Sequence, residues 1–159
     1  MGQTLIVRKM QPSEFDSTLI VVNYYVQEAQ EAMPEMAEEF DENSILQTVR
    51  HFATHMDHCW FNAYDQQRPV GFIAGYATET PWNHNIIDAH IAFVYLLDSH
   101  RNMENFRQLM DQFTQWARMI KAKNITGGDI GINPKKMQSL YEYFDFKPML
   151  MMTKELINE

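Results

Sequence analysis

The spacing of apolar residues along the chain predicts short strands alternating with amphipathic helices. Residues 4–10 (TLIVRKM) alternate as a strand does. Residues 12–33 and 43–56 repeat apolar side chains at helical spacing, and Pro12 and Ser13 favour a helix start at the first of these segments. We therefore expect two helices before the second strand.

The middle of the chain is typical of an antiparallel meander. Residues 58–65 (HCWFNAYD) and 70–80 (VGFIAGYATET) read as a hairpin, with its turn at residues 66–69 (QQRP). Residues 86–99 (IIDAHIAFVYLLDS) follow as a third, long strand.

The last third predicts a helix, a strand, a helix and a strand. Residues 103–124 form a strongly amphipathic helix, with apolar side chains at Met103, Phe106, Met110, Phe113, Ala117 and Ile120. Residues 125–132 read as a short strand, 134–144 as a helix and 146–156 as a closing strand. This order predicts an α/β (α+β) fold with a mixed, mostly antiparallel sheet of six to seven strands and helices on both faces.

Composition limits the kind of protein. With 159 residues, 45% of them hydrophobic, we expect one domain over residues 1–159. A net charge of −8 argues against nucleic acid as a partner, because such binding relies on Lys and Arg. The absence of a long apolar run and of a signal peptide, together with a single cysteine, predicts a cytoplasmic protein with no membrane partner.

Three segments resemble the GNAT superfamily of acetyl-coenzyme A dependent N-acetyltransferases. Residues 70–80 are similar to the family's central hairpin strand, and residues 94–110 (VYLLDSHRNMENFRQLM) to its cofactor-binding segment. Residues 139–156 (SLYEYFDFKPMLMMTKEL) are similar to the family's ending. The resemblance spans nearly the whole chain, and implies a GNAT-like fold with acetyl-coenzyme A as cofactor and a small-molecule or protein amine as acceptor.

The cofactor segment departs from the family's Arg-x-x-Gly-x-Gly motif. Arg101 matches the arginine, but Glu104 and Phe106 occupy the glycine positions and Asp98 stands where proline is common. Glycine lets a backbone approach a ligand closely, and a carboxylate at a helix start repels a diphosphate. Backbone amides are still present, because every residue except proline supplies one. A glycine-poor, degenerate cradle for diphosphate is the resulting prediction.

The resemblance assigns roles to particular residues. It implies that strand amides hold the thioester and pantetheine arm, and that the loop and the helix start hold the diphosphate; the residues are Tyr95, Leu96, Leu97, Arg101, Asn102, Met103, Glu104, Asn105, Phe106 and Arg107. It also implies that Tyr141 protonates the departing thiolate. Strand alternation places His90 on the same face as Ala92, Val94 and Leu96. His90 is our candidate base, with Glu79 and Asp88 as alternatives.

The acceptor surface is the least defined part of the prediction. The acidic stretch 35–42, with Glu38 and Glu39, favours a cationic acceptor, although acidic residues also occur in solvated helix starts. Glu79 and the loop residue Trp82 are further candidate acceptor contacts. We expect no metal, because His51, His55 and His58 lack the glutamate of a zincin motif.

Two functions remain open at this stage. One is direct acetyl transfer to a primary amine. The alternative is a catalytically inactive GNAT-like binding or assembly protein acting through protein–protein contacts. The compact chain, rich in Asn, Gln and Met, is similar to GNAT-like proteins of bacteriophages, for which the location would be the host cytoplasm. The apolar run PMLMM (148–152) would suit a homodimer contact.

Overall fold

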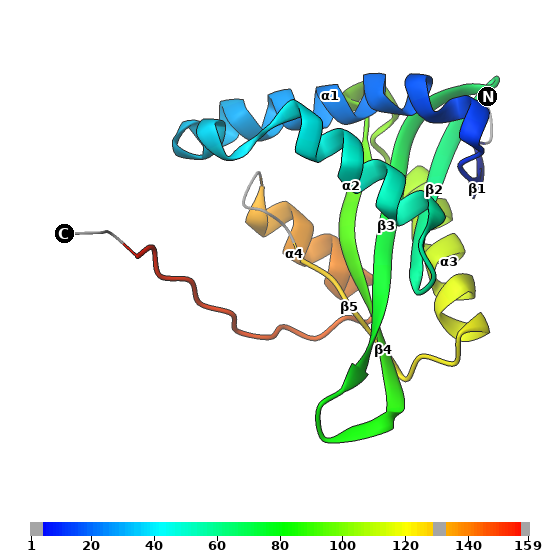
Figure 1. The fold of residues 1–159 in the computed structure, drawn as a ribbon, viewed down its shortest axis with the longest axis vertical. Coiled ribbons are helices and arrows are strands. Elements are labelled where there is room, and N and C mark those ends of the chain that lie inside the picture. The colour runs from blue at the N-terminus through cyan, green and yellow to red at the C-terminus, as the bar shows by residue number, and fades with distance from the viewer. Residues whose placement is uncertain (1–4, 129–132, 157–159) are drawn as a thin grey trace.

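The computed structural model describes residues 5–128 and 133–156 (Figure 1). Its strands are β1 (Ile6–Lys9), β2 (His58–Asp65), β3 (Arg68–Thr80), β4 (Asn83–Leu96) and β5 (Asn124–Thr126). Its α-helices are α1 (Phe15–Ala32), α2 (Glu42–Thr54), α3 (Met103–Met119) and α4 (Pro134–Tyr143). Short 3-10 helices are η1 (Pro12–Glu14), η2 (Pro34–Glu39) and η3 (Asp98–His100). The order of elements up to α4 is the one that the sequence predicts. Thr4 of the predicted strand 4–10 and residues 129–132 of the predicted strand 125–132 lie outside the described residues.

The strands form one sheet in the order β1-β2-β3-β4-β5, in which β5 is parallel to β4 and all other neighbours are antiparallel. The mixed, mostly antiparallel sheet is confirmed, but within the described residues it has five strands rather than six to seven. In the described part of the chain, no helix combines the length and apolar character needed to cross a bilayer.

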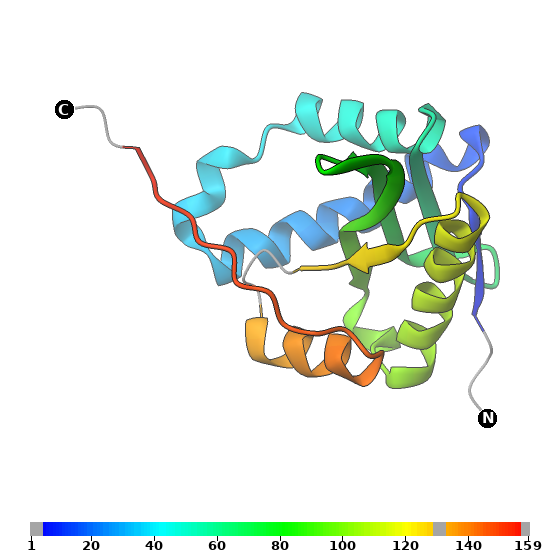
Figure 2. The same ribbon diagram turned by 90° about the horizontal axis from the view of Figure 1, so that it is seen from below.

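The predicted closing strand is the main difference. Residues 147–156 are not paired with any described strand and run away from the body of the molecule (Figures 1 and 2). Their apolar side chains are among the most exposed in the protein; they are Met149, Leu150, Met151, Met152 and Leu156. A run of residues with strand propensity becomes a strand only when a sheet edge accepts it.

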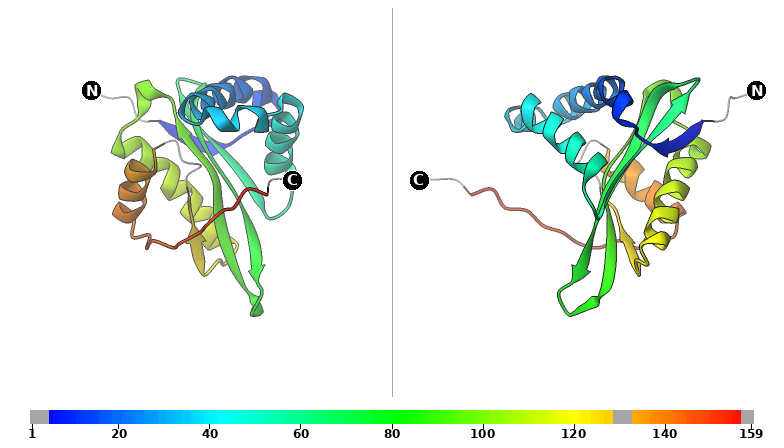
Figure 3. Two further views of the ribbon diagram at one scale, coloured as in Figure 1. Left: turned by 90° about the vertical axis from the view of Figure 1, so that its left-hand side faces the viewer. Right: turned by 45° about the vertical axis from the view of Figure 1, so that its right-hand side comes forward.

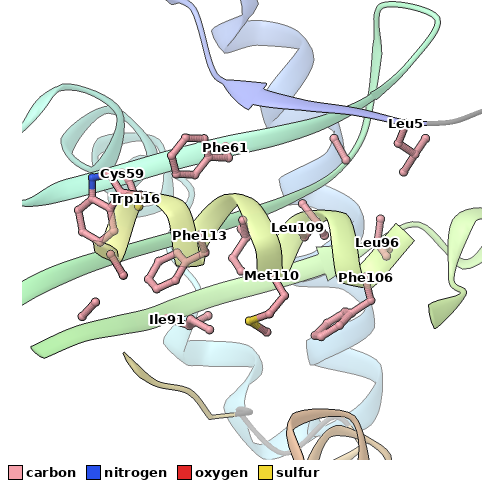
Figure 4. Packing of buried hydrophobic residues seen from close by; sticks show 14 of the residues in the cluster. Leu5, Cys59, Phe61, Ile91, Leu96, Phe106, Leu109, Met110, Phe113 and Trp116 are labelled. Carbon is pink, nitrogen blue, oxygen red and sulfur yellow. The ribbon is translucent and has the colours of Figure 1, made fainter. Parts of the chain in front are cut away.

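Helices cover both faces of the sheet, with α1 and α2 on one side and α3 and α4 on the other (Figure 3). The core on the α3 side is built around Phe113 and Leu109, which are fully buried (Figure 4). The core on the α1 side is built around Trp60 and Phe72. The helix of residues 103–124 ends earlier than the sequence indicates, because Lys121 has φ 63°.

A polar network ties β1, α1 and β2 together beneath α1. Asn62 is 1% exposed; its amide donates to Thr18 Oγ1 at 2.8 Å and its oxygen accepts from the Trp60 indole at 2.9 Å. Tyr64 donates to Glu14, and Glu14 accepts two hydrogen bonds from the Arg8 guanidinium at 2.7 and 2.8 Å. Each side chain of this network therefore has a hydrogen-bond partner, as burial requires.

An irregularity in β4 changes which residues face which core. Ala74 pairs with Phe93 but Gly75 pairs with Ile91, so Ala92 is an extra residue in β4. The simple alternation expected from the sequence is therefore wrong here. Because a bulge shifts the phase of a strand, Ile91 packs on the α3 side whereas Phe93 packs on the α1 side.

Candidate active site

Two neighbouring strands, β4 and the edge strand β5, separate after a short paired stretch. β4 and β5 are paired only from Asp88 to His90 on β4 and from Asn124 to Thr126 on β5. Beyond these pairs β4 continues to Leu96, while the chain after β5 leans toward α4 (Figure 1). Among the described residues, this stretch of β4 therefore has one edge not covered by a strand. The Leu96 carbonyl on that edge accepts from Arg101 Nε at 2.8 Å, and the main-chain groups there that Arg101 does not occupy are available to a ligand.

The backbone alternation decides which amides this open edge offers. The Leu97 amide donates to the Val70 carbonyl of β3, so Leu97 faces β3. By alternation the main-chain N–H and C=O of Tyr95 also point to β3, opposite its partner Phe72. The main-chain N–H and C=O of Leu96 consequently point to the open edge. Of the three strand residues that the resemblance assigned to the coenzyme, Tyr95 and Leu97 therefore use their amides within the sheet, and Leu96 does not.

Tyr141 lies beside the end of β5. It is 7% exposed, its hydroxyl donates to the Gly128 carbonyl at 3.0 Å, and its ring packs against Phe146. A Cβ at Gly127 would approach the Tyr141 ring to 2.5 Å, so glycine permits this close contact. The structure thus places the predicted proton donor where the two strands have separated.

His90 lies at the last paired position of β4. Its ring nitrogens are 2.7 Å from Thr78 Oγ1 on β3 and 2.7 Å from Thr126 Oγ1 on β5. The ring also packs on Tyr76, on the face that α2 covers. The two hydroxyls fix the imidazole, so a proton taken up by it would pass through one of them or require the ring to turn.

The loop after β4 is held by side chains. Asn102 caps α3 by accepting from the Asn105 amide at 2.8 Å, and the Asn105 side chain donates to the His100 carbonyl at 2.8 Å. His100 is anchored to Asp65 at 2.8 Å. These contacts fix the loop without glycine, and leave the amides of Asn102, Met103 and Glu104 at the helix start for a ligand.

The two residues at the glycine positions, Glu104 and Phe106, have side chains in different surroundings. The Phe106 ring points into the core, where it is 7% exposed and packs near Phe144 (Figure 4). Glu104 is exposed to solvent. The charge of Glu104 remains close to the helix start, so it still opposes an anion there.

Arg101 points across the end of β4 toward α1. Its Nε donates to the Leu96 carbonyl at 2.8 Å, and its terminal nitrogen donates to both oxygens of Glu28 at 2.6 and 2.8 Å. The Tyr95 hydroxyl donates to the same carboxylate. Burial and this carboxylate raise the pKa of Tyr95 above its usual value. Arg107 instead contacts Tyr143 of α4 at 3.0 Å.

A cavity of about 490 Å³ adjoins this ion pair. It lies between α1 and the loop that follows β4, on the α1 side of the sheet; its walls include Tyr24, Glu28, Glu31, Arg68, Tyr95 and Asp98.

Comparison with known proteins identifies the family. No curated protein matches the sequence. A family model described as the acetyltransferase (GNAT) family matches residues 21–146. The chain belongs to the GNAT acetyltransferase family.

Solved structures agree with this GNAT assignment at the level of fold. The aminoglycoside N-acetyltransferase AAC(6')-Iy in complex with CoA has a TM-score of 0.74 at 11% identity, over 99% of this chain and 97% of that one. The ribosomal-protein-alanine N-acetyltransferase of Brucella melitensis biovar Abortus 2308 has a TM-score of 0.70 at 13% identity, over 98% and 99%. The aminoglycoside 6'-N-acetyltransferase AAC(6')-Ih of Acinetobacter baumannii has a TM-score of 0.69 at 14% identity, over 98% and 100%.

The candidate acceptor residues of the GNAT chain lie in separate places. Glu38 and Glu39 are exposed on η2, which follows α1. Glu79 is on the hairpin of β3 and β4, and Trp82, 93% exposed, is at its tip; this hairpin projects from the opposite end of the sheet (Figure 1). Asp88, an alternative base, accepts a hydrogen bond from Asn124 across the β4–β5 pair.

The three clustered histidines of the GNAT chain stack at the end of α2. The rings of His51 and His55 are 3.9 Å apart, and that of His58 is 4.5 Å from His51. Partial loss of water and the two neighbouring imidazoles lower the pKa of His51. Within residues 5–128 and 133–156, no three or more His, Cys, Asp or Glu side chains are grouped so that they could hold a metal ion.

Glu28 is the site residue that sequence reasoning missed. It is one of several polar residues along α1, and no motif includes it. Only the fold brings it to Arg101, which is 73 residues away in the sequence. A carboxylate facing inward on a helix next to apolar neighbours would have been the available signal.

Proposed function

We propose that the protein transfers an acetyl group from acetyl-coenzyme A to a primary amine by direct attack. The observation that carries the proposal is the separation of β4 from β5, with Tyr141 beside the resulting open edge and the start of α3 at its end. Such an edge can hold an extended arm by main-chain hydrogen bonds, and the helix start can hold a diphosphate. Neither contact needs the missing glycines to be restored.

Each chemical step has a group to serve it. The open-edge main chain, including the Leu96 amide, would orient the thioester and stabilise the charge on its oxygen. His90 would take the amine proton, relayed by Thr78 or Thr126, since both ring nitrogens contact these hydroxyls. Tyr141 would donate its proton to the sulfur as the C–S bond breaks.

The acceptor is proposed to be a cationic small-molecule or protein amine. The net charge of −8 and the exposed carboxylates of η2, Glu38 and Glu39, would attract such a molecule. Glu79 and Trp82 on the hairpin are proposed as contacts for a larger acceptor, because they lie at the far end of the sheet. Among the structural neighbours are acetyltransferases of aminoglycosides and of a ribosomal protein.

The test is a thiol-release assay with acetyl-coenzyme A and a panel of polyamines, aminoglycosides and peptide N-termini. The protein's own thiol gives little background, because Cys59 is 2% exposed and burial raises its pKa to about 12. Amine-dependent thiol release is the expected result. If calorimetry detects no binding of acetyl-coenzyme A at millimolar concentration, the transferase proposal fails.

A second candidate function is a binding or assembly protein without catalysis, such as one from a phage. The exposed apolar residues 149–152 favour it, because such a surface is typical of a contact with another chain. We propose a homodimer in which this segment of one copy packs on the other. Such a dimer is compatible with either function.

A further inference from the structure

The arginine of the cofactor loop is already occupied by an anionic group from another element. Glu28 on α1 binds the Arg101 guanidinium at 2.6 and 2.8 Å, and both side chains are 33% exposed. A carboxylate and a phosphate use the same guanidinium N–H groups. We propose that Glu28 determines coenzyme affinity by masking Arg101, so that a diphosphate must displace its carboxylate. The identity of the anion rests on the proposed function.

Glu28 is not needed to aim Arg101. The guanidinium is oriented from the other side by the hydrogen bond from its Nε to the Leu96 carbonyl, at 2.8 Å. Asp98 adds only a loose contact at 3.5 Å. Glu28 therefore takes up the hydrogen bonds of a terminal nitrogen whose position is already set. Removing its charge should release donors in place, rather than let the side chain move away.

Tyr95 holds the mask in position. Its hydroxyl donates to the same carboxylate, and its ring lies 5.3 Å from the Arg101 guanidinium carbon. A tyrosine hydroxyl is protonated at neutral pH, so that of Tyr95 is a donor to Glu28 there, and the raised pKa of Tyr95 extends this to more alkaline pH. A hydroxyl and a cation together thus fix one carboxylate at the end of β4.

The structure also gives Glu28 room to leave. It lines the cavity of about 490 Å³ between α1 and the loop after β4. A turn of the Glu28 side chain into this space would keep its charge in contact with water while Arg101 is freed. A fully packed carboxylate could not separate from its cation without the cost of burying an unpaired charge.

The experiment compares Glu28→Gln with Glu31→Gln as a matched control. Glutamine keeps the size of Glu28 but loses the negative charge, so its amide oxygen binds the Arg101 guanidinium more weakly than the carboxylate does and is displaced more easily. Glu31 lies one turn further along α1 and lines the same cavity, but among the described residues it makes no hydrogen bond or ion pair with Arg101. Calorimetry would measure binding of coenzyme A and of inorganic diphosphate to the parent and both variants at low salt.

Masking predicts that Glu28→Gln binds both anions about fivefold more tightly, with Glu31→Gln within about twofold of the parent, because the effect of a charge falls with distance. Unchanged or weaker binding by Glu28→Gln would overturn the masking role, as would an equal gain in Glu31→Gln.

If the parent binds coenzyme A and Glu28→Gln binds it no better, the transferase proposal survives alone. If only diphosphate binds and does so more tightly in Glu28→Gln, masking survives and the transferase proposal fails. If no variant binds either anion, both fail.

Discussion

At the scale of single residues, the position of Tyr141 depends on a neighbour that has no side chain. Gly127 brings the main chain after β5 against the Tyr141 ring, and the Tyr141 hydroxyl donates a hydrogen bond to the Gly128 carbonyl. The hydroxyl is therefore directed at the end of β5, where the open edge of β4 begins.

Replacing Tyr141 by Phe should lower the rate of acetyl transfer about 100-fold, which is typical for loss of a general acid. The Michaelis constant for acetyl-coenzyme A should change little, and stability should fall by about 1 kcal/mol from the lost hydrogen bond. Steady-state kinetics and thermal melting measure these effects. Tyr143→Phe is the control, since Tyr143 is exposed on the same helix and its substitution also removes one hydrogen bond, the one from Arg107. An unchanged rate in Tyr141→Phe would remove the residue from catalysis.

The ion pair of Glu14 with Arg8 makes the stability of the folded protein fall at acid pH. Hydrogen bonds from Arg8 lower the pKa of Glu14 to about 2 from its ordinary 4.5. Because the folded-state pKa is the lower one, the stabilisation is complete above pH 4.5 and is lost as pH falls toward 2.

Glu14→Gln should therefore lower stability by about 1 to 2 kcal/mol at pH 7, a value reduced for partial solvent exposure. The parent should lose stability more steeply than the variant between pH 4.5 and 2. Urea unfolding at a series of pH values tests this, with the exposed Asp111→Asn as control. Parallel pH profiles for parent and Glu14→Gln would contradict the assignment.

At the scale of elements, the packing of α3 against β3 depends on Gly75. A Cβ there would lie 2.2 Å from the His90 carbonyl oxygen and 2.4 Å from the Phe113 ring. The carbonyl belongs to the backbone of β4 next to the bulge, so it cannot move without shifting the strand.

Gly75→Ala should destabilise the protein by about 2 to 3 kcal/mol through overpacking. Gly128→Ala is a matched control, because nothing lies within 4 Å of a Cβ there. The difference between the two melting temperatures is the measurement. Similar melting of the two variants would show that the strand and helix accommodate the methyl group.

The exposed segment after α4 is the element that predicts association. Paired Met149→Asp and Met151→Asp substitutions should convert a homodimer into a monomer, since they place charge on side chains that are 86% and 93% exposed here. Light scattering at about 100 μM protein measures the mass at a concentration where modest affinities are populated. A monomeric parent at that concentration would contradict the proposed dimer.

At the scale of the whole molecule, the two cores share the same central strands. The side chains of β3 alternate between them, with Phe72 on the α1 side and Ile73 on the α3 side. Loss of either core would expose one face of the sheet whose strands also form the other core. We therefore expect the two cores to unfold together.

The tryptophans make this cooperativity measurable. Trp60 belongs to the α1-side core and Trp116 to the α3-side core, while Trp82 is 93% exposed. In a Trp82→Phe background, variants that keep only Trp60 or only Trp116 should each show fluorescence and far-UV dichroism transitions at the same urea concentration. Separated transitions within one variant would indicate two independent units.

The fold was predictable wherever local periodicity and packing agree. The helix spacing of Phe106, Met110 and Phe113 predicts a buried face, and each of these residues is buried. The bulge at Ala92 was not predictable, because an apolar strand reads the same with or without an extra residue. The turn between β2 and β3 was predicted at residues 66–69 and lies there, although Gln66 and Gln67 both have positive φ and neither is the glycine or asparagine that usually marks such a turn.

The sequence by itself determined the order of elements, their apolar faces and the resemblance to GNAT proteins, because these depend on residues close together in the chain. Tertiary structure decided the rest: Tyr141 beside β5, Glu28 on Arg101, and an apolar end segment with no strand partner among the described residues. Such contacts join residues far apart in sequence. Their existence depends on how strands pair, shift register and separate, which local patterns do not encode.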